Sequence, residues 1–331
     1  MKNTVLYGDC RDTLKTIDTK IRMCVTSPPY YGLRDYGGEE NQIGLEQTPE
    51  EYIQQLVEVF RSVRDIMTDD GTLWVNIGDS YYNYRNSAGE HYAKQSFSKT
   101  RQDLPVHSPV RGNKLEGLKN KDLIGIPWML AFALRSDGWY LRQDIIWNKP
   151  NPMPESVKDR CTKSHEYIFL LSKNKNYYFD HKAISEPAQD WGTRDRTNGK
   201  YHNPGTGLQP HSGLTKSYER KNKRSVWTVN KKPYKGAHFA TYPEELIKPC
   251  ILAGSQENDI VLDPFMGSGT TGKVAVSLGR YYIGCELNPE YGTLIDKRIQ
   301  NTLSEHFEWK TLHNESYFNR ISVIYRISFK K

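Results

Sequence analysis

The stretch Asp263-Pro264-Phe265-Met266-Gly267-Ser268-Gly269-Thr270-Thr271 directly follows the apolar residues 260–262, and it predicts a strand, a glycine turn and a helix. A helix that begins at such a turn presents its backbone N–H groups to a ligand, and the glycines let the ligand reach them. The next apolar run, 281–285, ends before Glu286, which lies 23 residues after Asp263. This spacing suits an acid that binds ribose hydroxyls. The sequence therefore predicts a nucleoside-binding site at the carboxyl edge of a parallel sheet.

Two other nucleotide-binding patterns fit this stretch less well. A nicotinamide-binding turn needs three glycines at fixed spacing, and here the third glycine is missing. A P-loop is closer, because Gly272 and Lys273 follow Gly267 at the right distance, but it requires Ser or Thr where this chain has Val274. Val274 therefore argues against a nucleoside triphosphate held with magnesium at this turn.

A second short string, Ser27-Pro28-Pro29-Tyr30, follows a predicted buried strand at 22–26. An exocyclic amino nitrogen on an aromatic ring is a poor nucleophile, because its lone pair is delocalised into the ring. The Ser27 hydroxyl and the Pro28 carbonyl can accept both amino hydrogens and draw that nitrogen toward tetrahedral geometry. Consecutive prolines hold the carbonyl in extended geometry. Tyr30 can stack on the aromatic ring that carries the amino group. The string is a candidate catalytic site for transfer to an amino group.

The order of the two strings, catalytic first and cofactor last, resembles the beta class of the amino-methylating DNA methyltransferases. Those enzymes transfer a methyl group from S-adenosylmethionine to the amino group of cytosine or adenine. The resemblance extends through residues 31–36 and 74–80 and is absent from the two basic segments described below. It implies that the target base is flipped out of the duplex, because pairing buries its amino group.

The resemblance also implies cofactor-binding roles for particular residues. Asp263 and Phe265 would line the methionine and adenosine parts of S-adenosylmethionine, and Glu286 would hold its ribose. Further residues of the pocket would be its floor, Gly267, Ser268, Gly269 and Thr270, together with Phe239 in the segment 238–243 and Asp9 near the adenine.

The net charge of the chain is +7, and two segments carry a basic surplus. Residues 83–121 hold eight Lys and Arg against three Asp and Glu, and residues 186–235 hold eleven against four. Such a distribution indicates a polyanion-binding face, and interleaved aromatics such as Trp227 can stack on bases. We therefore expect double-stranded DNA as the partner. The candidate DNA contacts are Arg34, Arg194, Arg196, Arg220 and Arg224.

Predicted strands and helices alternate along the rest of the chain, which favours an α/β fold. Helical spacing is clearest over 49–67, where Thr48 and Glu51 form a capping box and Asp70-Gly71 ends the helix. We expect a doubly wound, Rossmann-like methyltransferase sheet with circularly permuted motif order and inserted DNA-recognition segments. The expected divisions are a catalytic half (1–82), a basic insertion (83–121), a methyltransferase core (122–185), a target-recognition region (186–235), a cofactor-binding half (236–312) and a tail (313–331).

Other features narrow the class of protein. Five cysteines are scattered without the paired spacing of a metal site, so we expect buried thiols and no bound metal. No apolar run reaches the ~20 residues that span a bilayer, and no charged-then-apolar leader opens the chain. These observations predict a cytoplasmic protein without a membrane partner. A homodimer is a further partner hypothesis, and so is a separate restriction endonuclease, because no nuclease signature stands out in this sequence.

The first residue of the catalytic string bears on the target base. Ser27 stands where Asp is common in adenine-specific relatives, which favours cytosine and a 4-amino product. A hydroxyl and a carboxylate can both accept the amino hydrogen, so adenine N6 stays the alternative target. An RNA methyltransferase and a catalytically inactive DNA-binding module are the remaining hypotheses, and the intact catalytic and cofactor strings argue against the second.

Overall fold

The structure is a computed structural model that describes residues 1–32, 42–82, 115–152, 154–188, 219–230 and 242–313. Its centre is an eight-stranded sheet in the order β1-β10-β9-β2-β3-β5-β4-β8. The first five strands of that order run parallel, β5 is antiparallel to β3 and β4, and β4 is parallel to β8. The strands are β1 (Thr4–Tyr7), β2 (Ile21–Thr26), β3 (Met67–Ile77), β4 (Tyr140–Asn148), β5 (His165–Ser172), β8 (Val226–Thr228), β9 (Ile260–Asp263) and β10 (Tyr281–Glu286).

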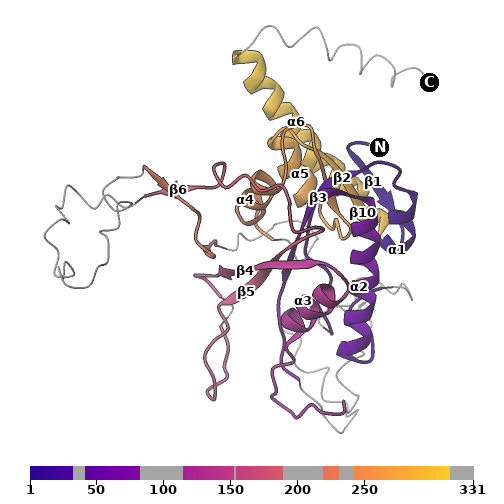
Figure 1. The fold of residues 1–331 in the computed structure, drawn as a ribbon, viewed down its shortest axis with the longest axis vertical. Helices are drawn as coiled ribbons and strands as arrows, with labels where there is room; N and C mark the ends of the chain where they lie inside the picture. The colour runs from indigo at the N-terminus through magenta and orange to yellow at the C-terminus, as the bar shows by residue number, and fades with distance from the viewer. Residues whose placement is uncertain (33–41, 83–114, 153, 189–218, 231–241, 314–331) are drawn as a thin grey trace, which may run out of the picture.

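Helices cover both faces of the sheet, as Figure 1 shows. One hydrophobic cluster includes Cys24 of β2 and the buried sides of α2 and α3, and the other includes Met23 and Val25 with α4, α5 and α6. This alternation along β2 is expected for a strand that is buried on both faces. The helices are α1 (Cys10–Thr13), η1 (Leu14–Thr16), α2 (Pro49–Ile66), α3 (Ile126–Ser136), α4 (Glu244–Gly254), α5 (Thr270–Ser277), η5 (Pro289–Tyr291) and α6 (Gly292–His313). The expected doubly wound α/β fold is confirmed.

The capping box of α2 is also confirmed, and the helix ends within one residue of the expected position 67, but the expected stop at Asp70-Gly71 is wrong. Thr48 Oγ1 accepts from Glu51 N at 3.2 Å, and Glu51 Oε2 accepts from Thr48 N at 3.2 Å. The helix ends at Ile66, and β3 begins with the next residue. Asp70 lies inside this strand, at an irregularity in its pairing with β2, where its side chain pairs with Arg22. The turn signal at Asp70-Gly71 therefore marks a bulge and not a helix terminus.

The second basic segment contributes a strand to the sheet. Within it, β7 (Arg220–Lys221) pairs with β6 (Glu186–Pro187) in a separate ribbon, whereas β8 pairs with β4. Trp227 of β8 is only 5% exposed, and its Nε1 donates to the Arg224 carbonyl at 2.7 Å. Trp227 is therefore a core residue, and the expectation that it can stack on a base is wrong. Residues 83–114 and 189–218 lie outside the described residues, so the expected domain divisions stay a prediction.

The sheet order places the two motif-bearing strands side by side. β9 comes late in the chain and β2 early, yet Met23 pairs with Val261 and Cys24 with Leu262 in parallel register. Because parallel strands end at the same edge, the residues after β2, β9 and β10 meet at the carboxyl edge of the sheet. The permuted order of motifs along the chain thus becomes a single contiguous site.

Replacing Trp227 with Ala should destabilise the protein by about 3–5 kcal/mol, because a buried indole is removed from the end of the sheet. Urea unfolding measures this free energy. The matched control is Val226→Ala on the same strand, where the side chain is 57% exposed and should contribute little. Equal, small effects of the two substitutions would contradict the placement of β8 in the core.

Candidate active site

Asp263 ends β9, and its buried carboxylate joins four parts of the site. Oδ1 accepts from Thr26 Oγ1 at 2.6 Å and from Phe265 N at 3.0 Å. Oδ2 accepts from Tyr242 OH at 2.9 Å and from Thr271 Oγ1. These donors come from the end of β2, the turn after β9, the segment before α4 and the first turn of α5. A single side chain therefore sets the relative position of both predicted motifs.

Two opposing effects of the surroundings act on the pKa of the Asp263 carboxyl. Burial raises the pKa of its carboxyl, and the hydrogen bonds from Thr26, Thr271, Phe265 and Tyr242 act in the opposite direction. A carboxylate offers about four acceptor positions, and four protein donors occupy them. Asp263 thus acts on the site by fixing the ends of β9 and β2. Its direct contact with a cofactor, like that of Phe265, stays a prediction.

The turn between β9 and α5 has the conformation that its glycines predict. Gly267 and Gly269 have φ angles of +52° and +82°, in the region where other residues are strained. A Cβ on Gly269 would also lie 3.0 Å from Ile295 Cγ2 of α6. The turn therefore has left-handed backbone conformation and packs closely against α6. Helix α5 begins directly after it with Thr270.

Arg298 of α6 holds this turn, and sequence reasoning missed it. Its Nη1 donates to Ser268 Oγ at 2.6 Å, to Thr270 Oγ1 at 3.0 Å and to the Ser268 carbonyl at 3.2 Å. The side chains of Ser268 and Thr270, both expected to bind the cofactor, are thus engaged by the protein itself. No local pattern marks Arg298, since its role depends on how α6 packs over the turn.

Glu286 ends β10 beside the same turn, as its spacing from Asp263 predicts. Its carboxylate accepts from Gly267 N at 2.8 Å through Oε2 and from Asn288 N at 3.0 Å through Oε1. Burial raises the pKa of Glu286 to about 7, although these backbone hydrogen bonds oppose the rise. The structure therefore brings Glu286, the predicted ribose-binding acid, to the glycine turn. At this position its carboxyl has a pKa of about 7.

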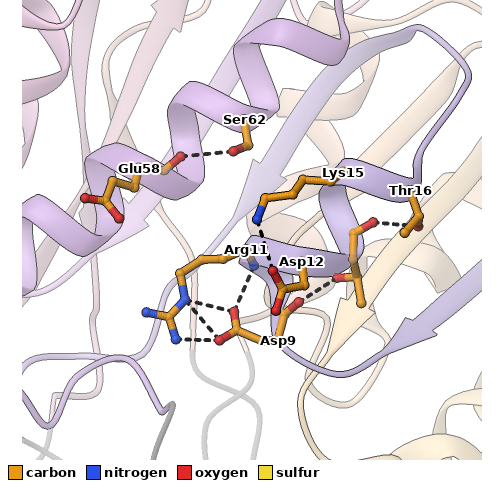
Figure 2. Close-up of polar contacts among 8 residues, drawn as sticks. Asp9, Arg11, Asp12, Lys15, Thr16, Glu58 and Ser62 are labelled. Atoms are coloured by element: carbon orange, nitrogen blue, oxygen red, sulfur yellow. Dashed lines mark hydrogen bonds and ion pairs between the residues drawn. The ribbon is translucent and has the colours of Figure 1, made fainter.

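Asp9 lies at the same edge, because β1 pairs with β10 and Gly8 N donates to the Glu286 carbonyl at 2.9 Å. Figure 2 shows its carboxylate beside Arg11, whose backbone N–H and guanidinium both donate to it. Burial raises the pKa of Asp9, but the hydrogen bonds from Arg11 outweigh this effect and the pKa is lowered. Asp9 also caps α1, so it orders the chain next to Glu286.

The catalytic string leaves β2 at Ser27 and is held from several elements. Tyr52 of α2 is buried, and its hydroxyl donates to the Pro29 carbonyl at 2.7 Å. The Tyr30 hydroxyl donates to Glu166 Oε2 of β5 at 2.8 Å. A Cβ on Gly78 would lie 2.8 Å from Tyr30 Cε2, so only glycine leaves room for this ring. Sequence reasoning missed Tyr52 and Glu166, which reach the string from remote segments.

The predicted DNA contacts are only partly described. Arg34, Arg194 and Arg196 lie outside the described residues, as does Phe239 of the cofactor prediction. Arg220 donates from Nε to Ser185 Oγ at 2.6 Å, and Arg224 donates to Glu186 Oε2 at 3.4 Å with its side chain 75% exposed. Both arginines belong to the region of the β6–β7 ribbon, which projects from the main sheet (Figure 1). Their contact with DNA stays a prediction.

The cysteines show no catalytic arrangement. Four are buried as expected, whereas Cys161 is exposed, against expectation. Cys250 follows Pro249 within α4, where burial raises the pKa of its thiol and makes it a poor nucleophile. The described residues contain no group of three or more His, Cys, Asp or Glu that could hold a metal ion. No helix in the described part of the chain is long and apolar enough to cross a bilayer.

Comparison with known proteins identifies the family of this chain. A family model described as DNA methylase, N6_N4_Mtase, matches residues 21–297. The Type II methyltransferase M.SmaI of Serratia marcescens is 48% identical over 296 residues, which cover 89% of this chain and 90% of that protein. The Type II methyltransferase M.Cfr9I of Citrobacter freundii is 47% identical over 298 residues, which cover 90% and 87%.

Solved structures share the fold. The PvuII DNA methyltransferase, described as cytosine-N4-specific, matches with a TM-score of 0.60 and 16% identity over 92% of each chain. A DNA modification methylase of Thermus thermophilus, TTHA0409, complexed with S-adenosyl-L-methionine, matches with a TM-score of 0.55 and 20% identity over 91% of this chain and 94% of that one. These likenesses concern the arrangement of the sheet and its helices.

The pKa of Glu286 leads to a pH-dependent affinity for S-adenosylmethionine. If the carboxylate accepts ribose hydroxyls, binding favours its ionised form, so affinity should fall as the pH falls below about 7. The fall should be at most about tenfold per pH unit for one proton. Titration calorimetry on both sides of this pH measures the dependence. Glu286→Gln should weaken binding and flatten the profile, whereas Glu290→Gln nearby should leave it unchanged, and a slope that persists in Glu286→Gln would contradict the assignment.

Removing the Arg298 side chain should loosen the glycine turn. Arg298→Ala deletes charge-assisted hydrogen bonds to Ser268 and Thr270, and we expect affinity for S-adenosylmethionine to fall about 10- to 100-fold. Equilibrium binding measures the change, with Lys297→Ala on the exposed side of α6 as the matched control. An Arg298→Ala protein that binds as tightly as the control would show that the turn needs no support from α6.

Proposed function

The chain belongs to the N6/N4 DNA methylases, and from this premise we propose that it methylates the 4-amino group of a cytosine flipped out of duplex DNA. It is an S-adenosylmethionine-dependent DNA methyltransferase. The observation that carries the proposal is the hydrogen bond from Thr26 to Asp263. It joins the strand that presents Ser27 to the strand that leads into the glycine turn, so an amino acceptor and a nucleoside site share one edge.

The residues at this edge fit S-adenosylmethionine. Glu286 offers a carboxylate for ribose hydroxyls, and the left-handed turn through Gly267 and Gly269 places the start of α5 beside it. The bound cofactor supplies a methyl group on a positively charged sulfur. The protein's part is to place that methyl group and the target nitrogen in line, because positioning supplies much of the barrier reduction.

On the side of the base, Ser27 Oγ and the Pro28 carbonyl accept the two amino hydrogens. The Tyr52 hydroxyl donates to the Pro29 carbonyl and so holds the peptide that follows. The bound cofactor would supply its methyl group to the target nitrogen, and Ser27 or water would accept the proton that this nitrogen then releases. Ser27, a neutral hydroxyl where adenine-specific relatives commonly carry Asp, favours cytosine as the target.

The relatives also suggest the biological setting. M.SmaI and M.Cfr9I are named as Type II methyltransferases. By analogy, this chain would protect a DNA sequence against a separate restriction endonuclease in a bacterial cytoplasm, where its substrate lies. The basic segments 83–121 and 186–235 are the candidates for reading that sequence, and association into a homodimer is the accompanying hypothesis for the assembly.

Incubation of unmethylated duplex DNA with the protein and methyl-labelled S-adenosylmethionine, followed by nucleoside mass spectrometry, tests the proposal. We expect the label in N4-methylcytosine, and a reaction without protein is the control. Label in N6-methyladenine would overturn the target base and retain the family. No label in DNA, but label when RNA replaces the duplex in a parallel reaction, would overturn DNA as the substrate.

A further inference from the structure

Tyr30 ends the catalytic string, and its backbone and its hydroxyl are both held by other parts of the fold. The hydroxyl donates to Glu166 Oε2 at 2.8 Å. The Pro29 carbonyl just before it accepts from Tyr52 OH at 2.7 Å, and a Cβ on Gly44 would lie 3.3 Å from the Tyr30 carbonyl oxygen. The residue is nevertheless only half-buried. Tyr30 is therefore fixed at two ends without being enclosed by the protein on every side.

Two contacts together fix the plane of the Tyr30 ring. The hydroxyl lies on the long axis of the ring, so its hydrogen bond to Glu166 fixes the direction of this axis. Gly78 limits rotation about the axis, because a Cβ there would lie only 2.8 Å from Tyr30 Cε2, and the glycine backbone thus lies close beside this ring atom. Loss of the hydroxyl contact would leave the ring free to tilt, although its size would be unchanged.

Glu166 is held in turn, so it can serve as a fixed anchor. Its Oε1 forms an ion pair with Lys149, whose side chain is 7% exposed and whose Nζ lies 4.3 Å from the centre of the Trp147 ring. Its Oε2 also accepts from Asn76 Nδ2 at 3.4 Å, and the same amide donates to the Tyr167 carbonyl at 3.1 Å. The carboxylate thereby connects the ends of β3 and β4 to the catalytic string.

The ion pair between Glu166 and Lys149 sets geometry more than it adds stability. For two buried charges, the loss of hydration offsets much of the mutual attraction, so such a pair adds little net stability to a fold. Its hydrogen bonds are directional, and each oxygen of this carboxylate has a defined partner. A network that ends on the hydroxyl of a half-buried aromatic residue fits a role in presenting that ring.

We propose that Glu166 is a positioning residue that sets the plane of the Tyr30 ring before the target base arrives, so that the flipped base stacks on a preformed surface. Stacking on an aromatic side chain is open to every base, because every base has a π face. A ring that is already immobile loses no further conformational entropy when the base binds. This inference rests on the proposed function and on the expected stacking of Tyr30, and it adds the residue that orients the ring.

Tyr30→Phe removes the anchored hydroxyl and keeps the ring. Hydrogen bonds to a charged group are among the stronger ones, so we expect the single-turnover methylation rate to fall about 10- to 100-fold. Affinity for S-adenosylmethionine should stay within about twofold of the wild-type value, because the contacts of Tyr30 and Glu166 involve β3, β4 and β5 and not the glycine turn.

A fluorescent base reports the stacking itself. In a duplex that carries 2-aminopurine at the methylated position, this base emits weakly when it is stacked and strongly when it is not. Its emission in the protein complex should therefore rise in Tyr30→Phe. The matched control is Tyr31→Phe, which removes a hydroxyl that donates to the Gln47 carbonyl at 3.1 Å in the segment before α2. This control should leave both the emission and the rate unchanged.

A double-mutant cycle tests whether Glu166 acts through the Tyr30 hydroxyl. In Glu166→Gln, Lys149 keeps the amide oxygen toward itself, so the amide NH2 group faces Tyr30 and cannot accept its hydrogen. This variant should show the same rise in emission and a similar loss of rate. In the Tyr30→Phe background, Glu166→Gln should lower the rate further by less than about twofold, because no hydroxyl remains to be anchored.

The outcomes distinguish this inference from the proposed function. A Tyr30→Phe protein with wild-type emission and rate would overturn the inference while the wild-type activity stands. Equal losses from Glu166→Gln with and without the Tyr30 hydroxyl would also overturn it, and so would a loss of cofactor affinity in both variants, since either result would assign Glu166 to general packing. A wild-type protein that methylates no amino group would overturn the proposed function and the inference together. Methylated adenine would remove only the cytosine assignment, and the same cycle would still decide the role of Glu166.

Discussion

The hydrogen bond between Thr26 and the buried Asp263 carboxylate is the contact on which the site depends, because it joins residues 237 positions apart in the chain. Thr26 is the last residue before the string Ser27-Pro28-Pro29-Tyr30, and Asp263 is the last residue of the strand that leads into the glycine turn. The same carboxylate also receives Tyr242 and Thr271. Burying it is unfavourable for its charged form, as its raised pKa shows, and the four donors offset that cost. Two motifs at opposite ends of the chain thereby act at one place.

Glu286 is the second acid at this edge, and burial raises the pKa of its carboxyl as well. Glu286 receives two backbone N–H groups, and the charge of nearby Asp263 adds to the effect of burial in raising its pKa to about 7. In the ligand-free protein this carboxyl therefore resists ionisation. Its ionisation lowers the free energy of unfolding as the pH rises from the pKa of the unfolded chain toward 7. A ligand that donates hydrogen bonds to it favours the ionised form. The raised pKa of Glu286 thus lowers the stability of the ligand-free protein, and a ligand that donates hydrogen bonds to this carboxylate would offset the loss.

The catalytic string shows how a short loop is held rigidly by remote elements. Tyr52 of α2 binds the Pro29 carbonyl, and Glu166 of β5 binds the Tyr30 hydroxyl. Gly32 N adds a backbone bond to the Gly44 carbonyl at 2.9 Å, just beyond the string. In the proposed role of this string, oxygen atoms that are fixed before a base binds need no reorganisation during the reaction.

The sequence by itself determined the local elements and their chemistry. The capping box at Thr48 and the glycine turn after Asp263 depend on neighbouring residues, so they can be predicted from spacing alone. The alternation of strands and helices also predicted the fold class, and the order of the two strings predicted the permuted arrangement. Local signals were misleading where tertiary pairing overrode them: Asp70-Gly71 is a bulge inside β3, and Trp227 is buried in the sheet. Only the tertiary structure decided that Arg298 holds the turn, that Tyr52 and Glu166 hold the string, and that Thr26 meets Asp263. These contacts join distant segments, and their existence depends on strand order and helix packing, which no short stretch of sequence encodes.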